Sequence, residues 1–352
     1  MTNLRETFKP YKNSKVIVTG GSGFIGSHLV KKLFELGCSK ILNIDKLTYA
    51  GNETRNSQYH NSETYSFVNQ DIASNKFIDD VIEFNPDYIF HLAAESHVDR
   101  SIENPGEFID SNIYGTMNIL TSMRSLKEKN NNCRLVHIST DEVYGSLPHP
   151  EDCPNQPLSF FTEKTPYNPR SPYSASKASS DHLVSAWVET YDIDAVITHC
   201  SNNYGLNQDF EKFIPKTILS CVEGKPIIIY GDGKNIRDWL HVSDHCRGLI
   251  LSAQKGIKGN VYNFGGDNEI ENCEIVNIII KLMQDMKIKV NHFTPLNELI
   301  TMTSDRPGHD RRYAVDSSFS KKELGWSQEI TFIDGLIDTI GLYVEQIKVS
   351  QS

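Results

Sequence analysis

Short apolar runs alternate with longer amphipathic stretches over the N-terminal part of the chain. The runs lie at residues 16–18, 41–44, 65–68, 88–92, 135–138 and 195–198. Each has the length of a buried strand, whereas apolar residues between the runs recur at helical spacing, as at Ile25, Leu29 and Leu33. Strands that alternate with helices predict an α/β fold of the Rossmann type, with a doubly wound parallel sheet.

The alternation is less regular beyond residue 205. A further strand is expected at residues 227–230, and the apolar run 261–264 is expected to return to the main sheet. We therefore predict one domain at residues 1–205, with a returning segment near 240–265, and a smaller α/β domain interleaved with it at residues 206–352. Residues 107–129 and 172–190 are expected to form long helices and are candidates for a dimer surface.

A glycine-rich turn directly follows the first apolar run. Gly20, Gly23 and Gly26 occupy this turn, and a helix is expected to begin at Phe24 and Ile25. Glycines at this spacing allow the pyrophosphate of a dinucleotide to approach the backbone, and the helix N-terminus meets its charge. The motif alone is a weak signal, but its position between a strand and a helix predicts a dinucleotide site.

Acidic residues end the next two predicted strands. Asp45 lies about twenty residues after the last glycine, where a carboxylate binds ribose hydroxyls and repels a 2′-phosphate. It therefore favours NAD over NADP, although the neighbouring Lys46 weakens that preference; the alternative is that Asp45 only caps a turn. Asp71 either faces an adenine or caps the following helix.

Composition excludes several classes of function. The net charge of −10 and the pI of about 5.7 argue against a broad surface for nucleic acid or anionic membrane. The seven cysteines are scattered and contain no Cys-x-x-Cys, which is typical of reduced thiols in a cytoplasmic protein. The first fourteen residues lack the apolar core of a signal peptide, and no run has membrane-spanning length. No metal is expected, because His241 and His245 lack supporting ligands.

Two polar stretches are the candidates for catalysis. Thr140, Asp141 and Glu142 follow the apolar run 135–138, so they are expected at the carboxyl end of a strand, where open α/β sheets place their sites. Two adjacent carboxyl groups can divide acid and base roles if their surroundings separate their pKa values.

The second stretch opens a predicted helix at Ser171 and Pro172, which suit the cap and the first turn. Tyr173 and Lys177 then share one helical face, and a nearby ammonium can lower the pKa of a phenol enough to make it a base near neutral pH. The alternative is a surface tyrosine with an incidental lysine.

The combination of the glycine turn, Thr140 and Tyr173-x-x-x-Lys177 resembles the extended short-chain dehydrogenase/reductase family. Within that family, the longer motifs at residues 45–52, 93–101, 140–142 and 306–312 resemble those of the dTDP-glucose 4,6-dehydratases. The resemblance runs from about residue 15 to residue 326. It implies NAD as cofactor, a nucleotide-sugar substrate and a cytoplasmic homodimer.

The resemblance also implies a redox-neutral elimination that gives a 4-keto-6-deoxy sugar. Tyr173 would take the 4-hydroxyl proton while hydride passes from C4 to NAD, with Thr140 hydrogen-bonding the same oxygen and Lys177 holding the phenolate. Glu142 would remove the C5 proton, and Asp141 would protonate the departing 6-hydroxyl before hydride returns to C6.

Binding residues are implied by the same motifs. For the cofactor they are Gly20, Gly23, Phe24, Ile25, Gly26, Asp45, Lys46, Leu47, Thr48, Asp71, Ile72, Leu92, Ala93, Ala94, Tyr173, Lys177 and Asn203. For the nucleotide sugar they are Ser96, Thr140, Asn202, Lys212, Phe213, Ile228, Tyr230, Arg237, Asn272, Arg306 and His309.

The chain departs from the family pattern at a few positions. His199 stands where Arg is usual, Leu206-Asn207 replaces a usual Pro-aromatic pair, and Phe213 replaces a common Leu. These changes leave the nucleotide base open, so UDP-glucose is the alternative substrate. A nucleotide-sugar 4-epimerase or decarboxylase would not need Asp141 and Glu142, and a non-catalytic NAD-binding sensor would not need to keep the catalytic set.

Overall fold

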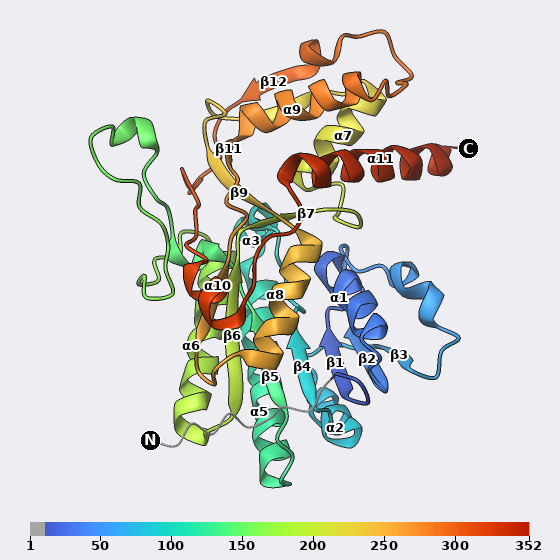
Figure 1. Ribbon diagram of the computed structural model, residues 1–352, viewed down its shortest axis with the longest axis vertical. Helices are drawn as coiled ribbons and strands as arrows, with labels where there is room; N and C mark the ends of the chain where they lie inside the picture. The colour runs from blue at the N-terminus through green and yellow to red at the C-terminus, as the bar shows by residue number, and fades with distance from the viewer. Residues whose placement is uncertain (1–10, 352) are drawn as a thin grey trace.

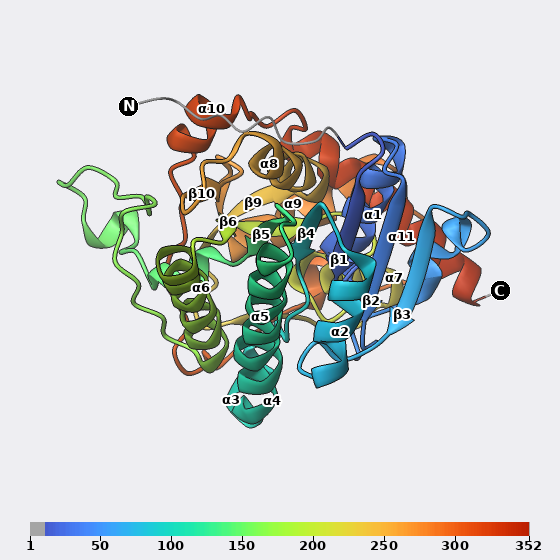
Figure 2. The same ribbon diagram turned by 90° about the horizontal axis from the view of Figure 1, so that it is seen from below.

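Seven parallel strands form the main sheet, in the order β10-β6-β5-β4-β1-β2-β3 (Figures 1 and 2). The computed structural model describes residues 11–351, with side chains up to residue 348. The doubly wound parallel sheet predicted from the apolar runs is confirmed. The strands are β1 (Lys15–Thr19), β2 (Lys40–Asp45), β3 (Tyr65–Asn69), β4 (Tyr88–His91), β5 (Arg134–Ile138), β6 (Asp194–Cys200) and β10 (Val261–Phe264).

The order of the strands reverses between β1 and β4, where ligands of such sheets usually bind. Helices α1 and α8 cover one face of the sheet, and helices α2, α5 and α6 cover the other (Figure 2). Burial on both faces explains why the strands are nearly continuous apolar runs, as in Val16, Ile17 and Val18. The helices are α1 (Phe24–Glu35), α2 (Asn75–Phe84), α5 (Gly115–Glu128), α6 (Pro172–Tyr191) and α8 (Val242–Lys255).

The predicted helix at residues 107–129 is not continuous. It is divided into α4 (Pro105–Phe108), a π-helical segment η2 (Ile109–Tyr114) and α5, after a short α3 (Val98–Glu103). Within η2, the backbone carbonyl of Asn112 accepts hydrogen bonds from the hydroxyls of Thr116 at 2.6 Å and Ser180 at 2.7 Å. These side-chain donors favour the wider turn, and such π segments are frequent at functional sites.

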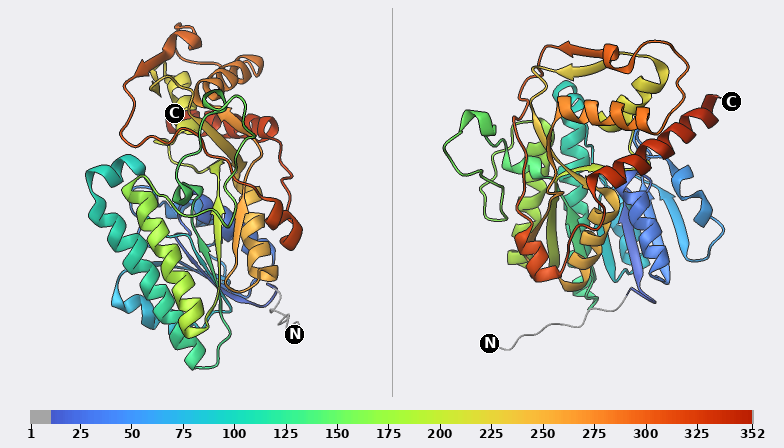
Figure 3. Two further views of the ribbon diagram at one scale, coloured as in Figure 1. Left: turned by 90° about the vertical axis from the view of Figure 1, so that its left-hand side faces the viewer. Right: turned by 45° about the horizontal axis from the view of Figure 1, so that its top comes forward.

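A second hydrophobic core lies beyond one end of the main sheet (Figures 1 and 3). It packs helices α7, α9 and α11 against two small sheets, one of order β11-β9-β7 and one that pairs β12 with β8. Its elements are β7 (Asn202–Tyr204), α7 (Phe213–Glu223), β8 (Ile227–Tyr230), β9 (Ile236–His241), β11 (Glu269–Glu271), α9 (Asn272–Asp285), β12 (Ile300–Thr303) and α11 (Phe332–Gln351).

The remaining elements are short. They are η1 (Glu53–Tyr59), η3 (Asp141–Tyr144), η4 (Pro150–Asp152), η5 (Leu296–Leu299) and α10 (Ser318–Leu324). In the part of the chain that the structure describes, no helix is both long and apolar enough to cross a bilayer. The expectation about a signal peptide concerns mainly residues 1–10, which lie outside the described residues.

Candidate active site

A cavity of about 320 Å³ opens at the carboxyl ends of the main-sheet strands, across the point where their order reverses. All of the catalytic candidates line it, namely Thr140, Asp141, Glu142, Tyr173 and Lys177. Most of the cofactor candidates line it too, namely Gly20, Gly23, Phe24, Ile25, Gly26, Asp45, Lys46, Thr48, Ile72, Leu92, Ala93, Ala94 and Asn203. Leu47 and Asp71 are not part of the lining.

The glycine turn forms one wall of the cavity, and its geometry requires glycine. Gly20 has φ +74°, and a Cβ there would lie 2.7 Å from the backbone nitrogen of Ala93. A Cβ on Gly26 would lie 2.0 Å from the carbonyl oxygen of Gly20. Because α1 begins at Phe24, its first backbone N–H groups lie at the same wall, where they can meet a phosphate. The turn therefore fits the pyrophosphate of a dinucleotide.

Asp45 ends β2 beside this turn. Its carboxylate accepts hydrogen bonds from the backbone N–H groups of Ser22 at 3.1 Å and Leu47 at 2.9 Å, and burial raises its pKa despite these bonds. The carboxylate is thus fixed in orientation, and its oxygens retain lone pairs for ribose hydroxyls.

The ammonium group of Lys46 is paired with neighbouring side chains and is therefore not available to a 2′-phosphate on the ribose. Its ammonium donates to the hydroxyl of Ser111 at 2.6 Å and lies within 3.7 Å of the carboxylates of Asp71 and Glu95. Asp71 also accepts from the backbone N–H of Ala73 at 2.8 Å in the turn before α2, whereas the N-cap residue of α2 is Ser74. With Lys46 paired, the site favours NAD over NADP.

Two helix starts bring the catalytic candidates together. Thr140 caps η3 by accepting from the backbone N–H of Glu142 at 3.3 Å, so that both carboxyl groups lie at the end of β5. Ser171 caps α6 in a full capping box with Ser174, followed by Pro172. This start places Tyr173 and Lys177, both buried, on the wall that faces Thr140.

The two adjacent carboxyl groups differ in their electrostatic surroundings. Burial raises the pKa of Asp141 well above its usual range, and the charges of Glu142 and Asp238 raise it further. Burial also raises the pKa of Glu142, but the guanidinium groups of Arg306 and Arg237 oppose this rise. Asp141 is thus favoured as the acid and Glu142 as the carboxylate, and the Oδ2 atom of Asp141 has no hydrogen-bond partner among the described residues.

The expected effect of Lys177 on Tyr173 is outweighed in this structure. Burial raises the pKa of Tyr173 well above its usual range, and the charge of Glu142 adds to the rise, while a hydrogen bond with Thr140 lowers it. The ammonium of Lys177 donates instead to the backbone carbonyl of Ile138 at 2.8 Å. The role of Tyr173 as a base near neutral pH, for which Lys177 was expected to supply a positive charge, stays a prediction.

The substrate candidates fall into two groups. Ser96, Thr140, Asn202 and Lys212 line the cavity, whereas the others lie outside its lining. The others are Phe213 in α7, Ile228 and Tyr230 in β8, Arg237 in β9, Asn272 at the start of α9, and Arg306 and His309 in the loop after β12. Most of them therefore lie on, or directly after, elements that surround the second core.

Arg237 and Arg306 are the members of the second group whose charges reach the site. Arg237 is buried, lies 4.4 Å from the ring of Tyr313 and donates to the carbonyls of Ile236 and Asp310. Arg306 lies 3.5 Å from the carboxylate of Asp99. Neither is only a surface ion pair, because both oppose the rise in the pKa of Glu142.

Several lining residues were missed by the sequence analysis. They include Glu95, Ser111, Ser139, Cys200, Ser201, Gln208 and Asp209. Ser139 directly follows the predicted strand 135–138, and Ser201 lies three residues after the predicted strand 195–198, so their positions near strand ends could have identified them. Gln208, which donates to the carbonyl of Asn203 at 2.9 Å, lies in a loop without a recognisable pattern.

A glycine turn, an acidic residue after the second strand and a Thr–Tyr–Lys set around one cavity define an extended short-chain dehydrogenase/reductase. The family model described as GDP-mannose 4,6 dehydratase matches residues 17–339. A dTDP-glucose 4,6-dehydratase from Salmonella typhimurium is 48% identical over 94% of this chain and 92% of its own length. The dTDP-glucose 4,6-dehydratase 1 of Escherichia coli is 46% identical over 95% of this chain and 94% of its own length. The chain belongs to the dTDP-glucose 4,6-dehydratase family, as the sequence motifs predicted.

Solved structures agree with this assignment. The dTDP-glucose 4,6-dehydratase from Streptomyces venezuelae with NAD and TYD bound is 36% identical, with a TM-score of 0.85 over 95% of this chain and 98% of that one. The enzyme from Bacillus anthracis in complex with NAD is 39% identical, with a TM-score of 0.82 over 95% and 98%. A UDP-glucose 4-epimerase from Thermotoga maritima, at 24% identity and a TM-score of 0.81 over 95% and 99%, shares the fold.

Proposed function

We propose that the protein is an NAD-dependent hydro-lyase that converts dTDP-glucose to dTDP-4-keto-6-deoxyglucose. One observation carries the proposal: Asp141 and Glu142, whose charged neighbours differ, line the same cavity as Tyr173 and Lys177. An epimerase on this fold needs the tyrosine and the lysine but has no elimination for an acid and base pair to catalyse. The names of the most similar relatives support the same activity and the same nucleotide sugar.

The cofactor is held by the chain in a defined orientation. The turn around Gly20 and Gly26 and the N-terminus of α1 bind the pyrophosphate, and Asp45 binds the adenosine ribose. Asn203 and Lys177, which line the same cavity, are assigned to the nicotinamide end. When bound, NAD accepts a hydride from the sugar and later returns it, so no external oxidant or reductant is needed.

The first half of the reaction oxidises C4 of the glucose. Tyr173 takes the proton of the 4-hydroxyl, and Thr140 donates a hydrogen bond to the same oxygen. Lys177 supplies a positive charge that lowers the free energy of the phenolate. The resulting 4-ketone makes the proton on C5 acidic.

The second half removes water across C5 and C6. Glu142 takes the C5 proton, while Asp141 donates a proton to the 6-hydroxyl so that water departs. Glu142 returns its proton to C5 when C6 takes back the hydride that the cofactor would hold, and the proton taken by Tyr173 replaces the one that Asp141 gave to the departing water. The net change is the loss of one water molecule.

The nucleotide sugar is assigned to residues 206–352, and NAD to residues 1–205 with the returning segment near 240–265. Lys212, Arg237 and Arg306 match the charge of a diphosphate. The other assigned residues are Phe213, Ile228 and Tyr230 for the base, and Ser96, Asn202, Asn272 and His309 for the rest of the nucleotide sugar.

We also propose a cytoplasmic homodimer. The region around η2 and the start of α5 exposes large apolar side chains at Ile109, Tyr114 and Met117, which is the kind of surface that a second copy covers. The seven cysteines are free thiols, which agrees with a reducing compartment.

The proposal is tested by incubating the protein and NAD with dTDP-glucose or with UDP-glucose. The mass of each nucleotide sugar is then measured by mass spectrometry. We expect loss of one water from dTDP-glucose, and none with a Tyr173→Phe variant. Water loss from UDP-glucose alone would assign the other base. Formation of the C4 epimer without a change of mass would overturn the dehydratase assignment.

A further inference from the structure

A buried carboxylate lies one helical turn behind the catalytic lysine. Asp181 follows Lys177 by four residues on α6, so the two side chains share a face of the helix. Lys177 is 3% exposed and Asp181 is 1% exposed. The mechanism proposed above gives Asp181 no role. Burying a charged side chain costs free energy unless the charge is paired and hydrogen-bonded.

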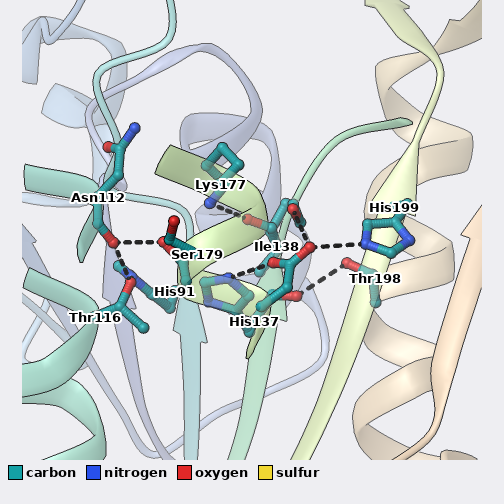
Figure 4. Close-up of polar contacts among 12 residues, drawn as sticks. His91, Asn112, Thr116, His137, Ile138, Lys177, Ser179, Thr198 and His199 are labelled. Atoms are coloured by element: carbon teal, nitrogen blue, oxygen red, sulfur yellow. Dashed lines mark hydrogen bonds and ion pairs between the residues drawn. The ribbon is translucent and has the colours of Figure 1, made fainter. Parts of the chain in front are cut away.

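Asp181 is tied to the two strands that carry the site. Its carboxylate accepts hydrogen bonds from His137 Nε2 at 3.1 Å and Ser139 Oγ at 2.9 Å, both at the end of β5, and from His199 Nε2 at 3.0 Å on β6. Figure 4 shows His137 and His199 on neighbouring strands, with Lys177 directed at the carbonyl of Ile138. The cluster thus fixes α6 against the strand end that leads into Thr140.

The cluster leaves a negative charge available to Lys177. Burial tends to raise the pKa of Asp181, but the hydrogen bonds from His137 and His199 lower it more, so the group is a carboxylate. Burial and the charge of Lys177 lower the pKa of His137 to about 4, and its Nδ1 atom has no hydrogen-bond partner among the described residues. His137 is therefore neutral and does not cancel the charge, whereas the charge of His199 contributes to the low pKa of Asp181.

Lys177 needs such a counter-charge to stay protonated. Burial lowers the pKa of Lys177, and the charge of Asp181 is the strongest influence that opposes the decrease. An ammonium whose hydrogen-bond acceptor is a neutral carbonyl, that of Ile138, would otherwise be poorly compensated in the interior.

We propose that Asp181 is a positioning residue for catalysis, the buried counter-charge that keeps Lys177 an ammonium and the acceptor that fixes the end of β5 through His137 and Ser139. The role rests on the proposed function, because that function assigns Lys177 to stabilising the phenolate of Tyr173. A neutral Lys177 would no longer stabilise the phenolate. Asp181 would then act on the rate without touching substrate or cofactor.

Other ionisable groups surround the pair and define the controls. Tyr144 lies at the far end of the cluster, where its hydroxyl is 2.7 Å from His199 Nδ1. The titratable groups that face the cluster from the packed elements are His91, His137, Asp141, Glu142, Tyr144, Glu163, Tyr167, Tyr173, His199 and Cys200.

The first test compares the pH profiles of kcat for Asp181→Asn and for Tyr144→Phe. Asparagine keeps the shape of the side chain but removes its charge, so we expect kcat at neutral pH to fall about tenfold. The part of the profile in which kcat increases with pH should move to higher pH by about one unit. The KM for the nucleotide sugar should stay near the parent value. Tyr144→Phe removes a buried hydrogen bond of the same cluster and should lower stability without moving the limb. Equal pH profiles for the two variants would overturn the proposal.

The second test needs no substrate and therefore separates this proposal from the proposed function. Urea unfolding is measured for Lys177→Met, Asp181→Asn and the double variant. If the two groups are counter-charges, Lys177→Met leaves the buried carboxylate of Asp181 with its hydrogen-bond donors but without the ammonium, and adding Asp181→Asn restores part of the lost stability. Additive losses, or a double variant that fails to fold, would refute the pairing. This cycle also decides the matter if Asp181→Asn alone does not fold.

Discussion

The substitution Gly26→Ala gives the sharpest structural prediction for the cofactor site. A Cβ at this position would lie 2.0 Å from the carbonyl oxygen of Gly20 and 2.7 Å from the Cα of Gly21. Both contacts are with backbone atoms, and real Cβ contacts are essentially never shorter than 3.0 Å, so the turn must open by about 1 Å. Overpacking of this kind costs about 1–3 kcal/mol.

The substitution should also weaken cofactor binding. Because the displaced backbone is the surface that meets the pyrophosphate, an error of about 1 Å should weaken NAD binding about a hundredfold, by analogy with misplaced catalytic groups. The affinity is measured by titrating intrinsic fluorescence with NAD, and stability by urea unfolding.

A matched control is available in α11. Gly341→Ala places its Cβ no closer than 3.9 Å to another atom, the Cε of Met286, and alanine has the higher helix propensity. We expect this variant to gain up to about 1 kcal/mol with unchanged NAD affinity. If Gly26→Ala also kept the parent affinity for NAD, the reasoning about close approach at the turn would be refuted.

Further predictions concern the carboxyl groups and a buried histidine. In D₂O, the Asp141→Asn variant should still exchange the C5 proton of the sugar, while its rate of water loss falls about 10²–10⁴-fold. The Glu142→Gln variant should lose both the exchange at C5 and the loss of water. A normal rate of water loss in either variant would contradict the assigned roles. Asp45→Ala should weaken NAD binding at least about tenfold and should reduce the ratio of the affinities for NAD and NADP. Competition binding measures both effects. Burial lowers the pKa of His245 to about 3. Below pH 6.5 the unfolded chain therefore binds a proton at this histidine that the folded chain does not bind, so the free energy of unfolding decreases as the pH falls. The advantage of the parent over His245→Gln in unfolding free energy should therefore shrink by about 2 kcal/mol between pH 7 and pH 5; a constant difference would contradict the assignment.

The parts of the fold that follow from local pattern were predictable. Strands buried on both faces are apolar runs, so β1 to β6 and β10 could be located from the sequence. The cap at Ser171 was equally local, since Pro172 and the serines around it specify a helix start.

Features that depend on distant residues could not be predicted. The π segment before α5 arises because Ser180, far along the chain, hydrogen-bonds the carbonyl of Asn112. The Asp181 cluster joins two strands and a helix, and no spacing in the sequence indicates it. Burial and the charge of Glu142 raise the pKa of Tyr173, and neither influence could be read from the spacing of Tyr173 and Lys177.

The most direct test of the account follows a label through the reaction. Glucose carrying deuterium at C4 is supplied as its dTDP derivative, and the product is examined by NMR. Hydride that leaves C4 and returns to C6 within one active site must place the deuterium on the C6 methyl group of the 4-keto sugar. Deuterium that stays on C4 of an epimer, or that is lost to the solvent, would contradict the proposed intramolecular transfer.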